Sequence, residues 1–206
     1  MGRRSDHTRD QLREMILKST CQLIEDGGLR GLSIRKIAAE IGYTSGTIYQ
    51  VFENLDDLIV ETHVLTLKDL HATLADVEIG DDPETSLFEL AKTCLQFANA
   101  HQNRWNAVFF HMLPEQRTLP DHYVEQVTQL LAYGVKAIDP LFSQQGSAEA
   151  WLSARVLWSS LYGIVSLETT SKLSREEEAD VFIRTLLRNF LAGLKMELAQ
   201  PDSADA

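Results

Sequence analysis

Hydrophobic residues recur along almost the whole chain at intervals of three and four positions, the spacing that lines up side chains on one face of an α-helix. Stretches that alternate apolar and polar residues, as a strand would, do not occur, and glycine and proline fall between the periodic segments. The pattern therefore predicts an all-α fold of about nine helices. Their approximate ranges are 6–26, 34–41, 45–52, 54–76, 84–101, 105–112, 121–139, 148–173 and 175–198.

The helix predicted over 54–76 differs from the others because it carries two apolar stripes. The first contains Leu55, Leu58, Ile59 and Thr62, and the second, rotated away from it, contains Val60, Val64, Leu67, His71 and Leu74. A helix with one stripe near each end packs into two units at once, so we interpret it as a connecting rod. We expect a small domain over 1–53, a larger helical domain over 54–198 and a disordered tail over 199–206.

The last two predicted helices carry large apolar residues around much of their circumference. Two such helices at a chain end offer more apolar surface than one small helical layer can cover. Pairing of two copies through a four-helix contact would bury that surface, although packing inside the chain is an alternative. In a homodimer of this kind the interface residues would be Trp151, Leu161, Ile183, Leu187, Phe190 and Leu194.

The charge is distributed unevenly along the chain, which has a formal net charge of −11. The first 50 residues hold eight Lys or Arg against six Asp or Glu, a formal charge of +2, and the remainder holds 11 against 24, a formal charge of −13. A basic end on an acidic body is compatible with binding of a nucleic acid through that end. Arg3 and Arg4 could form an arm that reaches a phosphate or the minor groove, although a solvated tail is an alternative.

Several classes of function lack a signal in the sequence. No apolar run is long enough to span a membrane, and the N-terminus lacks the apolar core of a secretory signal, so we expect a cytoplasmic protein. The two cysteines and six histidines show no metal-binding spacing, and we expect neither a metal nor a cofactor. No Ser/His/Asp order, HExxH motif, Gly-rich phosphate loop or carboxylate pair indicates an enzyme.

Residues 33–52, SIRKIAAEIGYTSGTIYQVF, have the layout of a helix-turn-helix motif, with Gly42 in the turn. In this geometry the second helix enters the major groove of double-stranded DNA with its N-terminus, so small polar side chains there reach phosphates and base edges. A plain helical packing unit, in which Thr44 is only a cap, is the alternative. The candidate DNA contacts are Ser33, Arg35, Thr44, Ser45, Gly46, Thr47, Tyr49 and Gln50.

The stretch GLRGLSIRKIAAEIGYTSGTIYQVFENLDDL, residues 28–58, resembles the N-terminal domain of the tetracycline-repressor (TetR) family of bacterial regulators. In LWSSLYGIVSLE, residues 157–168, the likeness extends to the W-x-x-x-H-G pattern of one group of C-terminal domains in that family, with Tyr162 in place of the histidine. The resemblance implies a homodimer that reads a near-palindromic operator, usually as a repressor released by a small ligand. Leu55 occupies the position of a lysine that contacts phosphate in many members.

Aromatic and histidine residues of the larger domain are candidates for the ligand site. Apolar walls with a few polar tips suit an aromatic or amphipathic effector, although each of these side chains could equally belong to the core. The candidate pocket residues are His71, Phe97, His101, Trp105, Phe109, Met112, Tyr133, Trp158 and Tyr162. We expect a ligand-responsive repressor, with a constitutive repressor or an activator without a ligand as the alternative.

Overall fold

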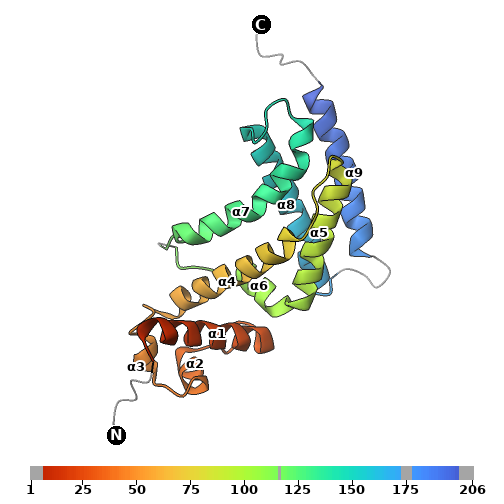
Figure 1. Ribbon diagram of the computed structural model, residues 1–206. Helices are drawn as coiled ribbons and strands as arrows, with labels where there is room; N and C mark the ends of the chain where they lie inside the picture. Colours follow the sequence, from red (N-terminus) through yellow and green to blue (C-terminus); the bar gives the residue numbers. More distant parts are fainter. Residues whose placement is uncertain (1–6, 116, 173–177, 200–206) are drawn as a thin grey trace. The chain divides into compact units, whose positions relative to one another are not determined.

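The computed structural model describes residues 7–115, 117–172 and 178–199, and within these ranges every regular element is helical (Figure 1). The all-α fold class is therefore confirmed. The elements are α1 (Arg9–Gly27), α2 (Ile34–Glu40), α3 (Ser45–Ile48), α4 (Leu55–Ala75), α5 (Pro83–Ala100), α6 (Gln102–Phe110), α7 (Asp121–Ile138), the short 3-10 helix η1 (Asp139–Leu141), α8 (Ala148–Thr169) and α9 (Ala179–Leu198). The predicted arm with Arg3 and Arg4 and most of the predicted tail lie outside the described residues.

Two helices, α3 and α8, end four residues before the hydrophobic pattern predicts. Helix α3 ends at Ile48 rather than at Phe52, and the chain continues in a turn in which the Phe52 N–H donates to the Ile48 carbonyl at 3.0 Å. Helix α8 ends at Thr169 because Ser171 turns into the left-handed region, with φ +54°. Apolar spacing continues through both turns, so it cannot mark where the backbone leaves the helix.

The chain forms two compact units, and the border between them falls inside α4. The first unit comprises Met1–Lys68 and His101–Glu125, and the second comprises Asp69–Ala100 and Gln126–Ala206. Helix α4 therefore contributes to both units. The first unit also contains α6 and the start of α7, which the sequence-based division at residue 53 assigns to the larger domain. The two units follow from contacts within the folded chain, whereas the sequence-based division separates the expected DNA-binding helices from all the others.

One apolar cluster holds the N-terminal helices of the first unit together. Its buried members are Ile16, Leu17, Ile34, Ile37, Ala38, Ile48, Phe52 and Leu58. They come from α1, α2, α3, the turn after α3 and the first turn of α4, so the cluster fixes the helix-turn-helix against two longer helices. Leu55 is partly buried against the same cluster and serves as a packing residue.

Specific residues terminate these helices. Thr8 and Gln11 form a capping box at the start of α1, and Gly28, with φ +65°, ends that helix. Gly42 has φ +73° in the turn between α2 and α3, where a side chain would strain the backbone. Directly after it, the Tyr43 N–H donates to the Ala38 carbonyl at 2.8 Å. These turns set the direction in which α3 leaves α2.

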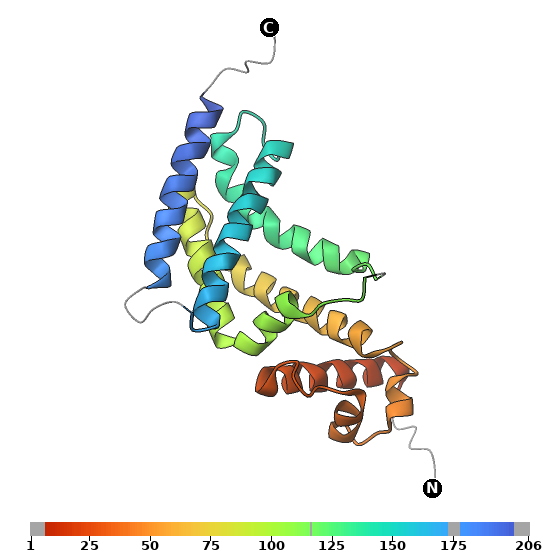
Figure 2. The same ribbon diagram turned by 180° about the vertical axis from the view of Figure 1, so that it is seen from behind.

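In the second unit, α5, α8 and α9 pack against one another (Figure 2). Ile183 and Leu187 of α9 are fully buried inside the chain, and Leu194 is 7% exposed. These three residues therefore belong to the core of a single copy, and this corrects their assignment to a surface shared between copies. Trp151, Leu161 and Phe190, the other predicted interface residues, are half-buried.

Candidate functional site

The helix-turn-helix displays all the predicted DNA-contacting residues at its surface. Arg35, Thr44, Gly46, Tyr49 and Gln50 are exposed, and Ser33, Ser45 and Thr47 are half-buried. The apolar residues between them face the cluster instead, so one side of the motif is polar and the other is packed. The side chain of Tyr49 is 56% exposed, which excludes its packing inside the unit.

Hydroxyl groups at the two helix starts behave differently. The Ser33 hydroxyl accepts a hydrogen bond from the Lys36 N–H at 3.3 Å, as expected of an N-cap. Thr44 occupies the N-cap position of α3, but its side chain makes no capping bond. Its Oγ1 lies 3.2 Å from Oγ1 of Thr47, so the two hydroxyls pair with each other. The Thr44 hydroxyl therefore does not cap α3, contrary to the alternative in which this residue is only a cap.

Two residues that the sequence did not indicate join this surface. Tyr43 follows the turn glycine, and its hydroxyl lies 2.7 Å from Nδ1 of His7. The two rings meet edge to face with centroids 6.2 Å apart. His7, which precedes the N-cap residue of α1, is therefore in contact with the turn of the helix-turn-helix. The only sequence signal was an aromatic residue directly after a turn glycine.

The basic residues of the first unit fall into paired and unpaired groups. The Arg13 guanidinium donates to Glu61 at 2.6 Å and lies 5.3 Å from the centre of the Phe52 ring, so its charge is used inside the unit. Arg35 and Lys36 of α2 are exposed, and within the described residues no carboxylate lies at ion-pair distance from either. These two charges are available to a polyanion.

The acids between α3 and α4 serve the helix start. Asn54 Oδ1 accepts the Asp57 N–H at 2.9 Å, and Asp57 Oδ2 accepts the Glu53 N–H at 3.2 Å. Carboxylates in the first turn also interact favourably with the helix dipole. Asn54 is therefore the residue whose side chain caps the start of α4.

A row of three side chains connects α4 to the segment after α6. Asp56 Oδ1 lies 3.1 Å from His111 Nε2, and His111 Nδ1 lies 3.3 Å from His63 Nε2. Burial, and to a lesser degree the neighbouring His111, lowers the pKa of His63 from 6.5 to about 3. His63 is therefore neutral at physiological pH and acts as a structural partner of His111. The sequence did not indicate this row, because the residues lie 48 positions apart.

Five of the predicted pocket residues lie in the second unit. The His71 and Tyr133 rings meet edge to face at 5.4 Å, and the Tyr133 hydroxyl donates to the His71 carbonyl at 3.5 Å. Phe97 is buried, and Trp158 and Tyr162, one helical turn apart on α8, are half-buried. The half-buried side chains of Trp158 and Tyr162 keep part of their surface accessible to a ligand, whereas Phe97 is a core residue.

The other four predicted pocket residues lie in the first unit. His101 Nδ1 lies 3.2 Å from Glu25 Oε1, and Trp105 is 2% exposed with its ring 4.9 Å from that of Phe109. Met112 is 88% exposed and belongs to the surface of this unit. His101 and Trp105 hold α6 in place within the first unit, whereas Met112 does not. The nine candidates do not gather within either unit.

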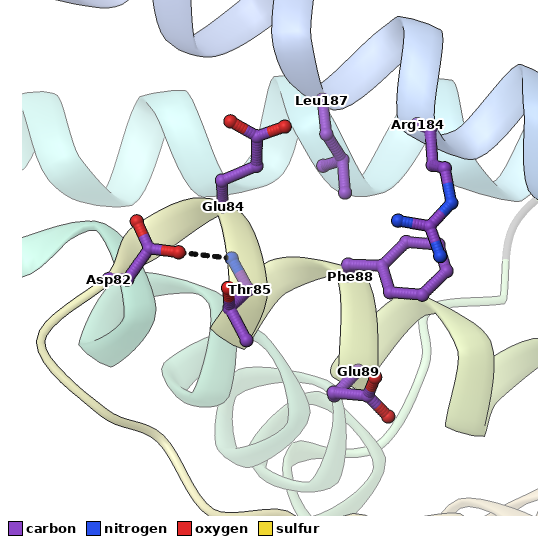
Figure 3. Close-up of a pocket in the computed structure, with 7 residues that line it drawn as sticks. All are labelled: Asp82, Glu84, Thr85, Phe88, Glu89, Arg184 and Leu187. Atoms are coloured by element: carbon purple, nitrogen blue, oxygen red, sulfur yellow. Dashed lines mark hydrogen bonds between the residues drawn. The ribbon is translucent and has the colours of Figure 1, made fainter.

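The second unit contains a pocket of about 260 Å³ that the sequence did not indicate (Figure 3). The Arg184 guanidinium lies 3.6 Å from the centre of the Phe88 ring, a cation–π contact. Asp82 Oδ2 accepts the Thr85 N–H at 3.0 Å and so caps α5. The lining residues are Asp82, Glu84, Thr85, Phe88, Glu89, Arg184 and Leu187. They come from two helices far apart in the chain, so no local pattern could reveal them.

Two known families of domain match the chain. Residues 16–62 match the bacterial regulatory proteins of the tetR family, and residues 87–190, half of the chain, match the tetracyclin repressor-like C-terminal domain. The chain belongs to the TetR family. It is therefore a DNA-binding transcriptional regulator, and this family is not an enzyme family. Within the described residues, no helix has the length and apolarity needed to cross a membrane.

Individual relatives agree with this assignment. The uncharacterized HTH-type transcriptional regulator Rv0681 of Mycobacterium tuberculosis is 24% identical over 176 residues, which make up 85% of this chain and 78% of Rv0681. The chain spans 60% of the length of the other curated regulators that it matches.

Solved structures share the fold. A TetR transcriptional regulator from Rhodococcus sp. RHA1 has a TM-score of 0.64 at 15% identity, over 91% of this chain and 100% of its own. The regulator FadR of Bacillus subtilis, in complex with stearoyl-CoA, has a TM-score of 0.66 at 14% identity, over 87% of this chain and 98% of its own.

The buried histidine predicts a pH-dependent stability. His63 stays neutral in the folded chain down to about pH 3, whereas an unfolded chain binds a proton there below pH 6.5. The free energy of unfolding should therefore decrease as the pH falls below 6.5. Between about pH 7.5 and about pH 5.5 the wild type should lose about 1 kcal/mol more than His63→Gln, measured by chemical denaturation. The two proteins differ only at residue 63, so the comparison reports the contribution of that histidine.

Identical pH dependence of the wild type and His63→Gln would contradict the prediction.

Proposed function

We propose that this regulator binds a near-palindromic operator as a homodimer and acts as a repressor that a small molecule releases. The polar face of the helix-turn-helix carries the first part of the proposal. Ser33, Arg35, Thr44, Ser45, Gly46, Thr47, Tyr49 and Gln50 contact the duplex. The hydroxyls, the amide and Arg35 are of the types that bind phosphates and base edges, and they surround a helix start that the major groove admits.

The homodimer is supported by an exposed stripe on each of the last two helices. On α8 the stripe consists of Leu152, Val156, Ser159 and Leu167, with the half-buried Gly163 between the last two, and on α9 of Val181, Thr185, Ala192 and Met196. Leu152, Val156, Val181 and Met196 are 60%, 51%, 57% and 68% exposed. Large side chains flank small ones in both stripes, which allows close approach of helices from a second copy. The half-buried Trp151, Leu161 and Phe190 border this surface in the proposed dimer.

The effector site in this proposal lies among the half-buried residues of the second unit, His71, Tyr133, Trp158 and Tyr162. Their apolar bodies and polar tips suit an aromatic or amphipathic compound. FadR of B. subtilis, which shares the fold, is in complex with stearoyl-CoA, an amphipathic ligand. Because Tyr162 replaces the histidine of the W-x-x-x-H-G pattern, a phenol takes the place of an imidazole in this site.

Release follows from a difference in affinity between two arrangements of the chain. A ligand that binds better to the arrangement unable to engage DNA shifts the population toward it, by no more than its differential affinity. Helix α4, which contributes to both units, is the element that such a shift would reorient. A constitutive repressor or an activator of the same fold is the second candidate. All of these functions belong in the cytoplasm, where the operator is.

The proposed recognition surface predicts the effect of Thr47→Ala and Tyr49→Ala. Loss of a contact to a base or phosphate should weaken operator binding about 5- to 100-fold for each variant, because such contacts contribute about 1–3 kcal/mol. The measurement is a titration of the protein against DNA from its own promoter region. Thr73→Ala, a threonine exposed on α4 in the second unit, is the matched control and should bind as the wild type does. Normal binding by both Thr47→Ala and Tyr49→Ala would refute the surface.

The proposed interface predicts that Val156→Glu combined with Met196→Glu gives monomers in sedimentation. Both side chains are exposed in the single chain, so charge there should leave the fold intact while repelling a second copy. Met112→Glu, an exposed methionine of the first unit, is the control and should remain dimeric. Dimers of the double variant at micromolar concentration would contradict the interface.

The proposed effector site predicts release of operator DNA by stearoyl-CoA and not by CoA alone. The dissociation constant of the operator complex should rise about 5- to 150-fold at saturation, the usual range of coupling between two sites. Tyr162→Ala should weaken the effect of the ligand without changing operator affinity in its absence. Operator binding that neither stearoyl-CoA nor other amphipathic compounds alter would favour the constitutive regulator.

A further inference from the structure

The start of α4 concentrates negative charge next to the proposed reading helix. Glu53, Asp56 and Asp57 lie there, Leu55 adds no positive charge, and Glu61 further along α4 is already paired with Arg13. Uncompensated carboxylates within about 10 Å of a duplex would repel its phosphates at physiological ionic strength. Asp57 takes part in the hydrogen bonds at the start of α4, but the negative charges of Asp57 and of the other acids remain. Something else must offset them if this end of the first unit is to approach DNA.

The segment between α6 and α7 provides that compensation, through Arg117. The Arg117 Nη1 donates to Asn54 Oδ1 at 2.8 Å. Its Nη2 lies 3.5 Å from Glu53 Oε2 and 3.6 Å from Asp57 Oδ1. A single guanidinium therefore contacts the cap residue and two acids at once, and its side chain is only 29% exposed.

Two histidines, His111 directly after α6 and His122 in the first turn of α7, lie close to the remaining acids. His111 Nε2 lies 3.1 Å from Asp56 Oδ1, and His122 Nε2 lies 2.9 Å from Glu61 Oε1. Each of the four acids thus has a partner in residues 111–122, which lie in the same unit as the helix-turn-helix. The backbone helps to orient the arginine, because the Arg117 N–H donates to the Pro114 carbonyl at 2.9 Å.

We propose that Arg117 is a positioning residue for DNA recognition that acts from outside the helix-turn-helix. It fixes Asn54, and with it the point where the chain leaves α3 and enters α4. It also supplies a positive charge at the start of α4, where Leu55 is neutral. The inference rests on the proposed DNA-binding surface, and it makes operator affinity depend on the segment that leads into α7.

The test compares operator binding by the wild type, Arg117→Ala, Glu53→Gln and the variant with both changes, over a series of salt concentrations. Arg117→Ala should weaken operator binding roughly tenfold, because a charged hydrogen-bonding group is lost. Glu53 is 80% exposed in its side chain, so Glu53→Gln removes one unbalanced charge without disturbing the core. The double variant should therefore recover much of the lost affinity. Arg117→Lys keeps the charge but not the fork of donors, and it should fall in between.

The dependence on salt separates positioning from direct contact. An arginine that contacts phosphate would lower the slope of log affinity against log salt by about one when removed, whereas a positioning arginine leaves the slope close to that of the wild type. Lys92→Ala, which removes one positive charge from α5 in the second unit, is the control and should bind as the wild type does.

The outcomes separate this inference from the proposal beneath it. Wild-type protein that binds no duplex overturns the proposed recognition surface and this inference together. Arg117→Ala with wild-type affinity overturns the inference alone. Weaker binding by Arg117→Ala that Glu53→Gln does not restore, with a lower thermal midpoint, assigns a general structural role to Arg117 and also overturns the inference.

Discussion

The helix-turn-helix depends on one packing constraint, the burial of Ile48 and Phe52 against α1, α2 and the start of α4. Helix α3 has four residues, and a single helical turn does not form by itself in water because its nucleation is unfavourable. Burial of an Ile or Phe side chain contributes about 1.5–3 kcal/mol, enough to hold such a turn in place. Burial of Ile48 holds the polar residues next to it in the sequence at the surface. The packing of the apolar cluster therefore determines which side chains are accessible to DNA.

Charged side chains around the helix-turn-helix have partners that lie far from them in the sequence. The acids at the start of α4 look unfavourable for a DNA-binding protein when only their neighbours in sequence are considered. In the folded unit, Asn54 caps the helix start and Asp57 Oδ2 accepts the Glu53 N–H. Arg117 and His111, from the segment after α6, and His122, from the first turn of α7, contact the acids. Arg13 is meanwhile paired with Glu61 within the same unit. The formal charge of a stretch of sequence therefore does not show which of its charged side chains remain without a partner in the folded unit.

The last two helices illustrate a second limit of local pattern. Both carry apolar residues on more than one face, and spacing alone does not say which face packs within the chain. In the structure Ile183, Leu187 and Leu194 turn inward, whereas Leu152, Val156, Val181 and Met196 remain exposed. The strong periodicity of α9 marks the core face, since that face must meet α5 and α8 along its whole length.

The sequence by itself determined the all-α class, the position of each helix to within a few residues and the helix-turn-helix, because these follow from local spacing, glycine turns and caps. It also determined the surface residues of the motif, since the apolar positions between them leave only one face for the core. Tertiary structure decided the His63–His111–Asp56 row, the contacts of Arg117, the pocket beside Phe88 and the division of apolar faces on α9. Each of these joins residues from distant parts of the chain, and no periodicity within one helix records which helix it will meet.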